Sequence, residues 1–146
     1  MSVERLVIDS CVAIKWRLRD ESELAQADAL QEDFVNGRVE LLAPTLFDYE
    51  IGNILKVAIS RKRLSEADAV IALADFKTIA LERFGVLPLQ SRVFDLAIHY
   101  QRSFYDASYL ALAENQGVDF YTGDKRLFNA VNSFFPWVKW IGDYPV

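Results

Sequence analysis

Cysteine and histidine are almost absent from this chain of 146 residues, which contains one of each, Cys11 and His99. A single cysteine excludes an intrachain disulfide and also excludes a zinc site built from cysteines. A single histidine leaves little room for a zinc or haem centre. We therefore expect any chemistry to rely on other side chains, in a reducing compartment such as the cytoplasm.

Long apolar runs are also missing. No stretch approaches the roughly 20 residues that a membrane-spanning helix needs. The segment Met1–Arg5 has an acidic residue early and no long apolar stretch after it, unlike a signal peptide. The formal net charge of −5 argues against broad electrostatic coating of nucleic acid. We expect a cytoplasmic protein without membrane association, in which local basic clusters are the groups that could contact a nucleic acid.

Hydrophobic residues make up 52% of the chain, which is enough to bury a full core. The length corresponds to one ordinary domain, and no repeat, linker or low-complexity segment divides it. We therefore expect residues 1–146 to form one domain.

Short apolar segments alternate with longer helical patterns along the chain. The segments predicted to be strands are 4–9, 39–43, 86–89, 118–122 and 137–141. The helical patterns after the first strand region cover about 22–36, a long stretch from 45, then 65–83, 91–101, 104–116 and a short stretch from 124. This alternation predicts a three-layer α/β/α fold with a central, mainly parallel five-stranded sheet.

Polar residues and glycines mark the ends of several predicted helices. Ser22 and Thr45 are predicted to cap two of them. Asp48 stands three residues after Thr45, at the position of a capping-box acid, so we interpret it as structural. Gly37 and Gly117 are predicted to end two helices.

Four acidic residues stand where this fold would bring them to one place. Asp9 and Asp124 follow predicted strands, and active sites of open α/β sheets lie beyond the carboxyl ends of the strands. Glu50 and Asp106 fall on the apolar sides of their predicted helices, where an unpaired carboxylate is unfavourable. A structural alternative is open for Asp9, Asp106 and Asp124, since each could cap a helix.

Together, the four carboxylates predict a bound cation. Two carboxylates ~5 Å apart repel by about 3 kcal/mol at an effective dielectric of about 20. Four of them cannot all stay ionised unless a cation binds or protons are taken up. Hard oxygen ligands of this kind favour Mg²⁺ or Mn²⁺. The first hypothesis is therefore metal-dependent phosphodiester chemistry.

Four motifs, each containing one of the acids, follow one another in the chain. They are VIDSCVAIKW (7–16), the segment 44–53, YDASYLALA (105–113) and TGDKRL (122–127). Their residues and order resemble the motifs of the PIN-domain nucleases, most closely those of the small prokaryotic VapC-like toxins of toxin–antitoxin pairs. One departure is visible, because Cys11 stands where the family often has serine or threonine. A hydroxyl role is therefore not carried over to position 11.

The resemblance implies a metal-dependent endoribonuclease of PIN-like fold. Its catalytic metal ligands, for Mg²⁺ or Mn²⁺, would be Asp9, Glu50, Asp106 and Asp124. Its auxiliary polar groups would be Thr122, Asn53 and Ser10. The partners implied by the resemblance are an RNA substrate, an antitoxin protein and a second copy of the chain in a homodimer.

Basic residues near the acidic motifs are the candidates for holding RNA phosphates. Lys125 and Arg126 directly follow Asp124, and Lys15 lies within the first motif. The cluster at 61–63 is interpreted as an interaction with a helix end, with RNA contact as the alternative. His99 is interpreted as a structural or surface residue because it stands away from the acidic motifs.

Other functions compete with this interpretation. The chain could be a catalytically inactive PIN-like binding module, although the presence of all four acids argues against it. It could also be a nuclease that acts in RNA processing without an antitoxin. A haloacid-dehalogenase-like phosphatase needs a second aspartate two residues after Asp9, and Cys11 occupies that position.

Overall fold

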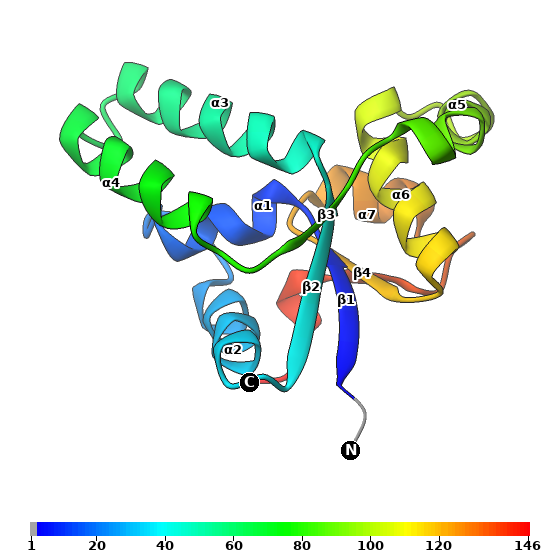
Figure 1. Ribbon diagram of the computed structural model, residues 1–146, viewed down its shortest axis with the longest axis horizontal. Coiled ribbons are helices and arrows are strands. Elements are labelled where there is room, and N and C mark those ends of the chain that lie inside the picture. Colours follow the sequence, from blue (N-terminus) through cyan, green and yellow to red (C-terminus); the bar gives the residue numbers. More distant parts are fainter. Residues whose placement is uncertain (1–2) are drawn as a thin grey trace.

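Five parallel strands form one sheet in the order β3-β2-β1-β4-β5 (Figure 1). The computed structural model describes residues 3–146, so Met1 and Ser2, which begin the segment judged unlike a signal peptide, lie outside it. The strands are β1 (Glu4–Ile8), β2 (Val39–Pro44), β3 (Glu82–Phe84), β4 (Asp119–Thr122) and β5 (Val138–Trp140). The predicted three-layer α/β/α fold is confirmed, and the sheet is parallel throughout.

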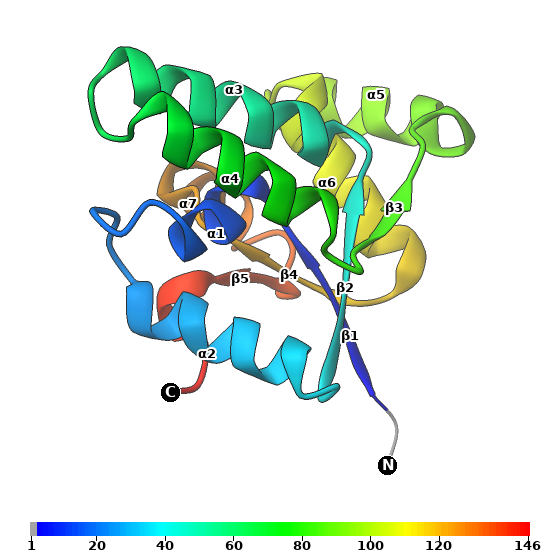
Figure 2. The ribbon, with the colours of Figure 1, turned by 60° about the vertical axis from the view of Figure 1, so that its left-hand side comes forward.

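Helices connect the strands and cover both faces of the sheet. They are α1 (Ser10–Ala13), α2 (Leu24–Val35), α3 (Leu46–Ser60), α4 (Glu66–Lys77), α5 (Gln90–His99), α6 (Phe104–Gln116) and α7 (Lys125–Val131). Helix α6 packs against β1, β2 and β4, with α5 outside it, whereas α2 packs against β2 on the other face (Figure 2). None of the helices in residues 3–146 combines the length and apolarity needed to cross a membrane.

The position of β1 in the middle of the sheet explains its continuous apolar sequence. Leu6, Val7 and Ile8 are all fully buried, because helices cover the strand from both sides. A strand buried on both faces reads as a continuous apolar run rather than as an alternating one. Helices α1, α3 and α7 then begin where β1, β2 and β4 end, so the residues at these junctions share one edge of the sheet.

The third strand differs from its prediction. It spans Glu82–Phe84 instead of 86–89, and the preceding helix ends at Lys77 instead of near Arg83. The segment Leu87–Leu89 forms a 3-10 turn with a proline in its first positions. Proline has no N–H to give to a strand ladder, whereas its fixed φ suits the start of a helical turn. The apolar run therefore becomes a turn, and the strand forms before it.

Two predicted helix caps are also wrong. Helix α2 does not begin at Ser22, and the residue at its N-cap is Glu23, whose φ of 54° is left-handed. Thr45 has helical backbone angles and makes no side-chain cap for α3. Asp48 is not a capping-box acid either, because its carboxylate accepts two hydrogen bonds from Arg83, at 2.7 and 3.0 Å. It remains structural, since it joins α3 to β3.

The predicted helix ends at Gly37 and Gly117 are confirmed, and both glycines have left-handed φ. We expect Gly117→Ala to lower the free energy of unfolding by about 1–2 kcal/mol, because a Cβ disfavours this conformation. Gly52→Ala is the matched control. It lies inside α3, where no atom comes within 4 Å of an added Cβ, and it should raise stability by about 0.5–1 kcal/mol. Urea denaturation measures both, and equal stability of Gly117→Ala and wild type would contradict the expectation.

Candidate functional site

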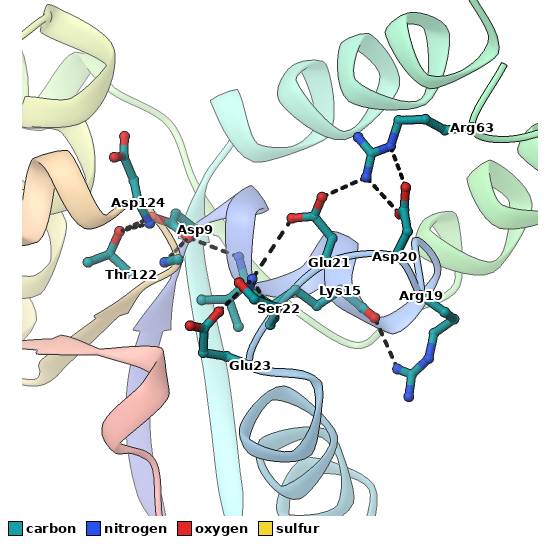
Figure 3. Close-up of polar contacts among 12 residues, drawn as sticks. Asp9, Lys15, Arg19, Asp20, Glu21, Ser22, Glu23, Arg63, Thr122 and Asp124 are labelled. Carbon is teal, nitrogen blue, oxygen red and sulfur yellow. Dashed lines mark hydrogen bonds and ion pairs between the residues drawn. The ribbon is translucent and has the colours of Figure 1, made fainter. Parts of the chain in front are cut away.

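Asp9 stands at the end of β1 and is fixed by three hydrogen bonds (Figure 3). One carboxylate oxygen accepts from the backbone N–H groups of Val12 and Gly123, each at 3.1 Å. The other accepts from the hydroxyl of Thr122. Asp9 therefore does cap α1, as the structural alternative proposed, and it also joins β1 to the loop after β4.

Burial dominates the chemistry of the Asp9 carboxylate. Asp9 is only 4% exposed to solvent. Removal from water and, to a smaller extent, the negative charge of Glu50 raise the pKa of Asp9 from 3.8 to about 7, against the lowering effect of its three hydrogen bonds. The site thus holds a carboxyl group that is only partly ionised at neutral pH.

Thr122 connects Asp9 to Asp124. Its side chain is fully buried, and while its hydroxyl donates to Asp9, the same oxygen accepts from the backbone N–H of Asp124 at 3.0 Å. Asp124 in turn caps α7, because one of its carboxylate oxygens accepts from the N–H groups of Arg126 and Leu127. The second oxygen is not used by this cap.

Glu50 faces the same edge from the second turn of α3. One carboxylate oxygen accepts hydrogen bonds from the hydroxyls of Tyr109, at 2.5 Å, and Ser10, at 3.3 Å. Burial raises the pKa of Glu50, the two hydroxyls lower it, and the charge of Asp106 raises it again. Ser10, which follows Asp9 in the chain, therefore contacts Glu50, and its role as an auxiliary polar group stays a prediction.

Asp106 lies in the first turn of α6 and is half-buried. Ser103 caps this helix, since its hydroxyl accepts from the backbone N–H of Asp106 at 2.9 Å. Burial raises the pKa of the Asp106 carboxyl, and the negative charge of Asp124 raises it further. Asp106 therefore takes part in the N-terminal cap of α6 and is also influenced by another acid of the site, so a structural role and a role in the acidic site do not exclude each other.

Mutual repulsion links the four acids into one electrostatic group. The charge of Glu50 raises the pKa of Asp9, that of Asp106 raises the pKa of Glu50, and that of Asp124 raises the pKa of Asp106. Within residues 3–146, no group of three or more His, Cys, Asp or Glu side chains is placed so that it could hold a metal ion. The donor set nevertheless fits a hard divalent cation, because it consists of carboxylate oxygens with hydroxyls beside them.

The profile of the PIN domain matches residues 6–132, which include all four acids. The chain belongs to the PIN-domain family.

Relatives of this PIN domain cover most of its length. Ribonuclease VapC9 of Mycobacterium tuberculosis is 32% identical over 124 residues, which are 84% of this chain and 87% of the relative. Ribonuclease VapC12 of the same organism is 27% identical over 122 residues, covering 84% and 88%.

Solved structures resemble the fold of this PIN domain. PAE2754 from Pyrobaculum aerophilum superimposes with a TM-score of 0.62 at 25% identity and covers 88% of this chain and 79% of its own. VapC20 of Mycobacterium tuberculosis, described as a sarcin-ricin loop cleaving toxin, has a TM-score of 0.61 at 16% identity and covers 86% and 95%.

Lys15 does not lie where a substrate-binding residue of this PIN domain could act. The residue is 3% exposed, and its ammonium donates to the carbonyl of Ser22 at 2.8 Å. It also lies 3.6 Å from Glu23 and 3.9 Å from Glu21, which pairs in turn with Arg63 (Figure 3). This placement contradicts the role predicted for Lys15, whose charge holds the loop before α2.

Lys125 and Arg126 are exposed at the start of α7, next to Asp124. The Lys125 ammonium lies over two rings, 5.0 Å from the centre of Phe128 and 4.5 Å from that of Trp140. Cation–π contacts of this kind restrain a lysine without neutralising it. Lys125 therefore carries a restrained positive charge beside the acids and remains a candidate for a phosphate contact.

Arg102 is a further cation at the site, and the sequence analysis missed it. Its positive charge lowers the pKa of the Asp106 carboxyl group. Its Nε donates to the carbonyl of Gln101 at 2.9 Å, which holds the base of the guanidinium. The signal available in the sequence was its position directly before the Ser103 cap and four residues before Asp106.

A cleft of about 750 Å³ opens beside the acids, between α3 and α6. Asn53 lines it and is exposed, so it lies beside the cleft one turn after Glu50 on α3. The lining residues are Ser10, Cys11, Pro44, Thr45, Leu46, Tyr49, Glu50, Asn53, Ile54, Val86, Phe104, Tyr105 and Ser108.

Tyr109 and Gly123 support the acids and were also missed. Tyr109 is buried and stacks on Phe120 with an interplanar angle of 8°, so its ring fixes the hydroxyl that holds Glu50. The signal was a polar hydroxyl on the buried side of α6, three residues after Asp106. For Gly123, nothing in the sequence indicates how closely its loop approaches α1.

Gly123 should be intolerant of any side chain. A Cβ there would lie 2.7 Å from the backbone carbonyl carbon of Cys11 and 2.8 Å from its oxygen. We expect Gly123→Ala to lower the free energy of unfolding by about 1–3 kcal/mol, because two backbone segments must separate. Gly85→Ala is the control, with no atom within 4 Å of the added Cβ. Thermal unfolding of both variants measures the difference, and equally small losses would contradict the expected overlap.

Asp9 should make metal-free stability fall with rising pH. Its pKa is raised from 3.8 to about 7 on folding, so the folded protein binds more protons than the unfolded chain between these values. The stabilisation is full below about pH 4 and is lost as the pH rises toward 7. In EDTA, wild type should therefore lose up to a few kcal/mol relative to Asp9→Asn across this range. Denaturation at several pH values measures this difference, and parallel curves for the two proteins would refute it.

Proposed function

We propose that this PIN domain is a divalent-metal-dependent endoribonuclease that hydrolyses phosphodiester bonds in RNA. The observation that carries the proposal is the meeting of Asp9, Asp124 and Glu50 at one edge of the sheet, where the hydroxyls of Thr122 and Ser10 join them, with Asp106 coupled to Asp124 by charge. Such a group favours a cation, and its oxygen donors suit Mg²⁺ or Mn²⁺. The relatives named ribonucleases, which align over most of the chain, support RNA as the substrate.

Each acidic residue has a defined part in this proposal. Asp9, held by three hydrogen bonds, presents one fixed carboxylate, and Glu50, held by Tyr109, presents a second. Asp106 and Asp124 complete the donor set. A bound Mg²⁺ or Mn²⁺ would lower the pKa of a water molecule and stabilise charge on the phosphate, so no protein nucleophile is required.

The biological role that we propose is the toxin of a toxin–antitoxin pair. The VapC ribonucleases that match this chain also match it over most of their own length, which supports this role. An antitoxin protein is then the expected partner. A homodimer, a cytoplasmic location and the identity of the metal stay predictions.

Removing one acidic charge should abolish cleavage without unfolding the protein. We expect Asp9→Asn and Asp106→Asn to cleave RNA at least about 100-fold more slowly than wild type, because even groups that only orient metal ligands cost 10- to 100-fold. Cleavage is measured on a panel of structured RNAs with Mg²⁺ or Mn²⁺. Calorimetric titration with Mn²⁺ should show weakened binding in both variants, independently of turnover.

Asp48→Asn provides the matched control on α3. It removes one negative charge two residues before Glu50 on α3, but Asp48 pairs with Arg83 and faces solvent. It should cleave RNA and bind Mn²⁺ like wild type. Equal metal-dependent cleavage by wild type, Asp9→Asn and Asp106→Asn would rule out the proposed site, and absence of both cleavage and Mn²⁺ binding in wild type would indicate an inactive module.

A further inference from the structure

We propose that the cleft between α3 and α6 binds an unstacked nucleobase of single-stranded RNA, next to the phosphate that the acidic site cleaves. This inference rests on the proposed ribonuclease function and adds the class of RNA and the residues that select it. It follows from the position of the cleft, from the exposed rings on its walls and from the absence of cationic groups among its lining residues.

The cleft is continuous with the acidic site. Its lining includes Glu50 itself and also Ser10, whose hydroxyl donates to Glu50. Its volume of about 750 Å³ lies in the range of small-ligand sites and is large enough for a nucleotide. A group bound there would therefore contact the acidic site at Glu50, the one of the four acids that lines the cleft.

Two exposed tyrosines line the cleft, one on α3 and one on α6. Tyr49 is 80% exposed and Tyr105 is 62% exposed, although both are large aromatic residues. Each directly precedes an acid in the chain, Glu50 or Asp106. Successive residues on a helix point about 100° apart, so the carboxylate and the ring occupy adjacent sides of the same helix. Each acid thus has a stacking surface beside it.

The chemistry of the lining favours a base over a phosphate. Apart from Glu50, every lining residue is uncharged, so nothing in the cleft would neutralise a phosphate. The cations near the acids, Arg102 and Lys125, are not among the lining residues. Phosphates are expected on those cations, whereas a flat and largely apolar base fits between aromatic walls.

Asn53 provides a polar group that can read the base. Its side chain is exposed at the cleft. An amide has both a donor and an acceptor, which matches the edge of a nucleobase. A base in a duplex is stacked and paired, so this site requires a loop, a bulge or a single strand.

The test measures steady-state cleavage of a single-stranded oligoribonucleotide whose cut site has first been mapped. Tyr49→Ala and Tyr105→Ala should raise KM about tenfold with little change in kcat, because the ring binds the ground state and the transition state alike. Tyr49→Phe and Tyr105→Phe keep the ring and should restore the wild-type KM. Phe94→Ala, which removes an exposed ring from α5 outside the cleft, is the control.

An abasic nucleotide identifies the base that enters the cleft. Replacing one base beside the cut should raise the KM of wild type about tenfold and have no further effect on the tyrosine-to-alanine variants. A wild-type KM that is unchanged at every abasic position would overturn the proposal. So would tyrosine variants that cleave like wild type, including the case in which they lose only the binding of an antitoxin protein, because the cleft would then be a protein-docking surface.

A binding measurement in EDTA distinguishes failure of the ribonuclease proposal from failure of the base-binding proposal. If wild type cleaves no RNA with either metal, the ribonuclease proposal fails, but the cleft is still tested by fluorescence anisotropy with the labelled single strand. Wild type should then bind about tenfold more tightly than Tyr49→Ala and Tyr105→Ala, and more tightly than it binds the same sequence as a duplex. Equal affinities would overturn the base site on its own.

Discussion

The carboxylate of Asp9 is the group on which the rest of the site depends. It follows the central strand, caps α1 and receives hydrogen bonds from Thr122 and Gly123, so two segments that are distant in the sequence meet at its two oxygens. These bonds offset only part of the cost of burial, as the raised pKa shows. Under the proposed function, binding of a cation at this position would displace the proton, as ligand deprotonation does in protein metal sites generally.

Charge is divided unevenly over the edge of the sheet. Lys15 and Arg63 are occupied by structural ion pairs, and the cleft beside Glu50 contains no cation among its lining residues. Among the described residues, Lys125 and Arg126 follow Asp124 directly at the start of α7, and the charge of Arg102 lowers the pKa of Asp106. With a net charge of −5, the protein as a whole repels a polyanion. Recognition of RNA by such a chain has to come from a few local cations and from contacts that do not depend on charge.

The sequence predicted best those residues that lie at the ends of regular elements. Asp9 and Asp124 follow buried strands of a parallel sheet, so topology alone brought them to one edge. The contact of Tyr109 with Glu50 depends on how two helices pack, and no spacing in the sequence contains that information. The prediction that Lys15 contacts RNA did not foresee that the loop before α2 covers this residue. The apolar run 86–89 was misread because apolar character identifies a buried segment without showing whether its backbone is extended or helical.

The two outer strands of the sheet are its shortest. β3 and β5 each have three residues, and charged side chains, Arg83 and Lys139, lie in them. Short and charged edges offer few unpaired backbone groups to another strand. The sheet is therefore a poor template for growth by strand addition, which protects the protein from edge-to-edge aggregation. Association with other chains is left to the helices, among them α4 and α5, which expose Ile71 and Ile98.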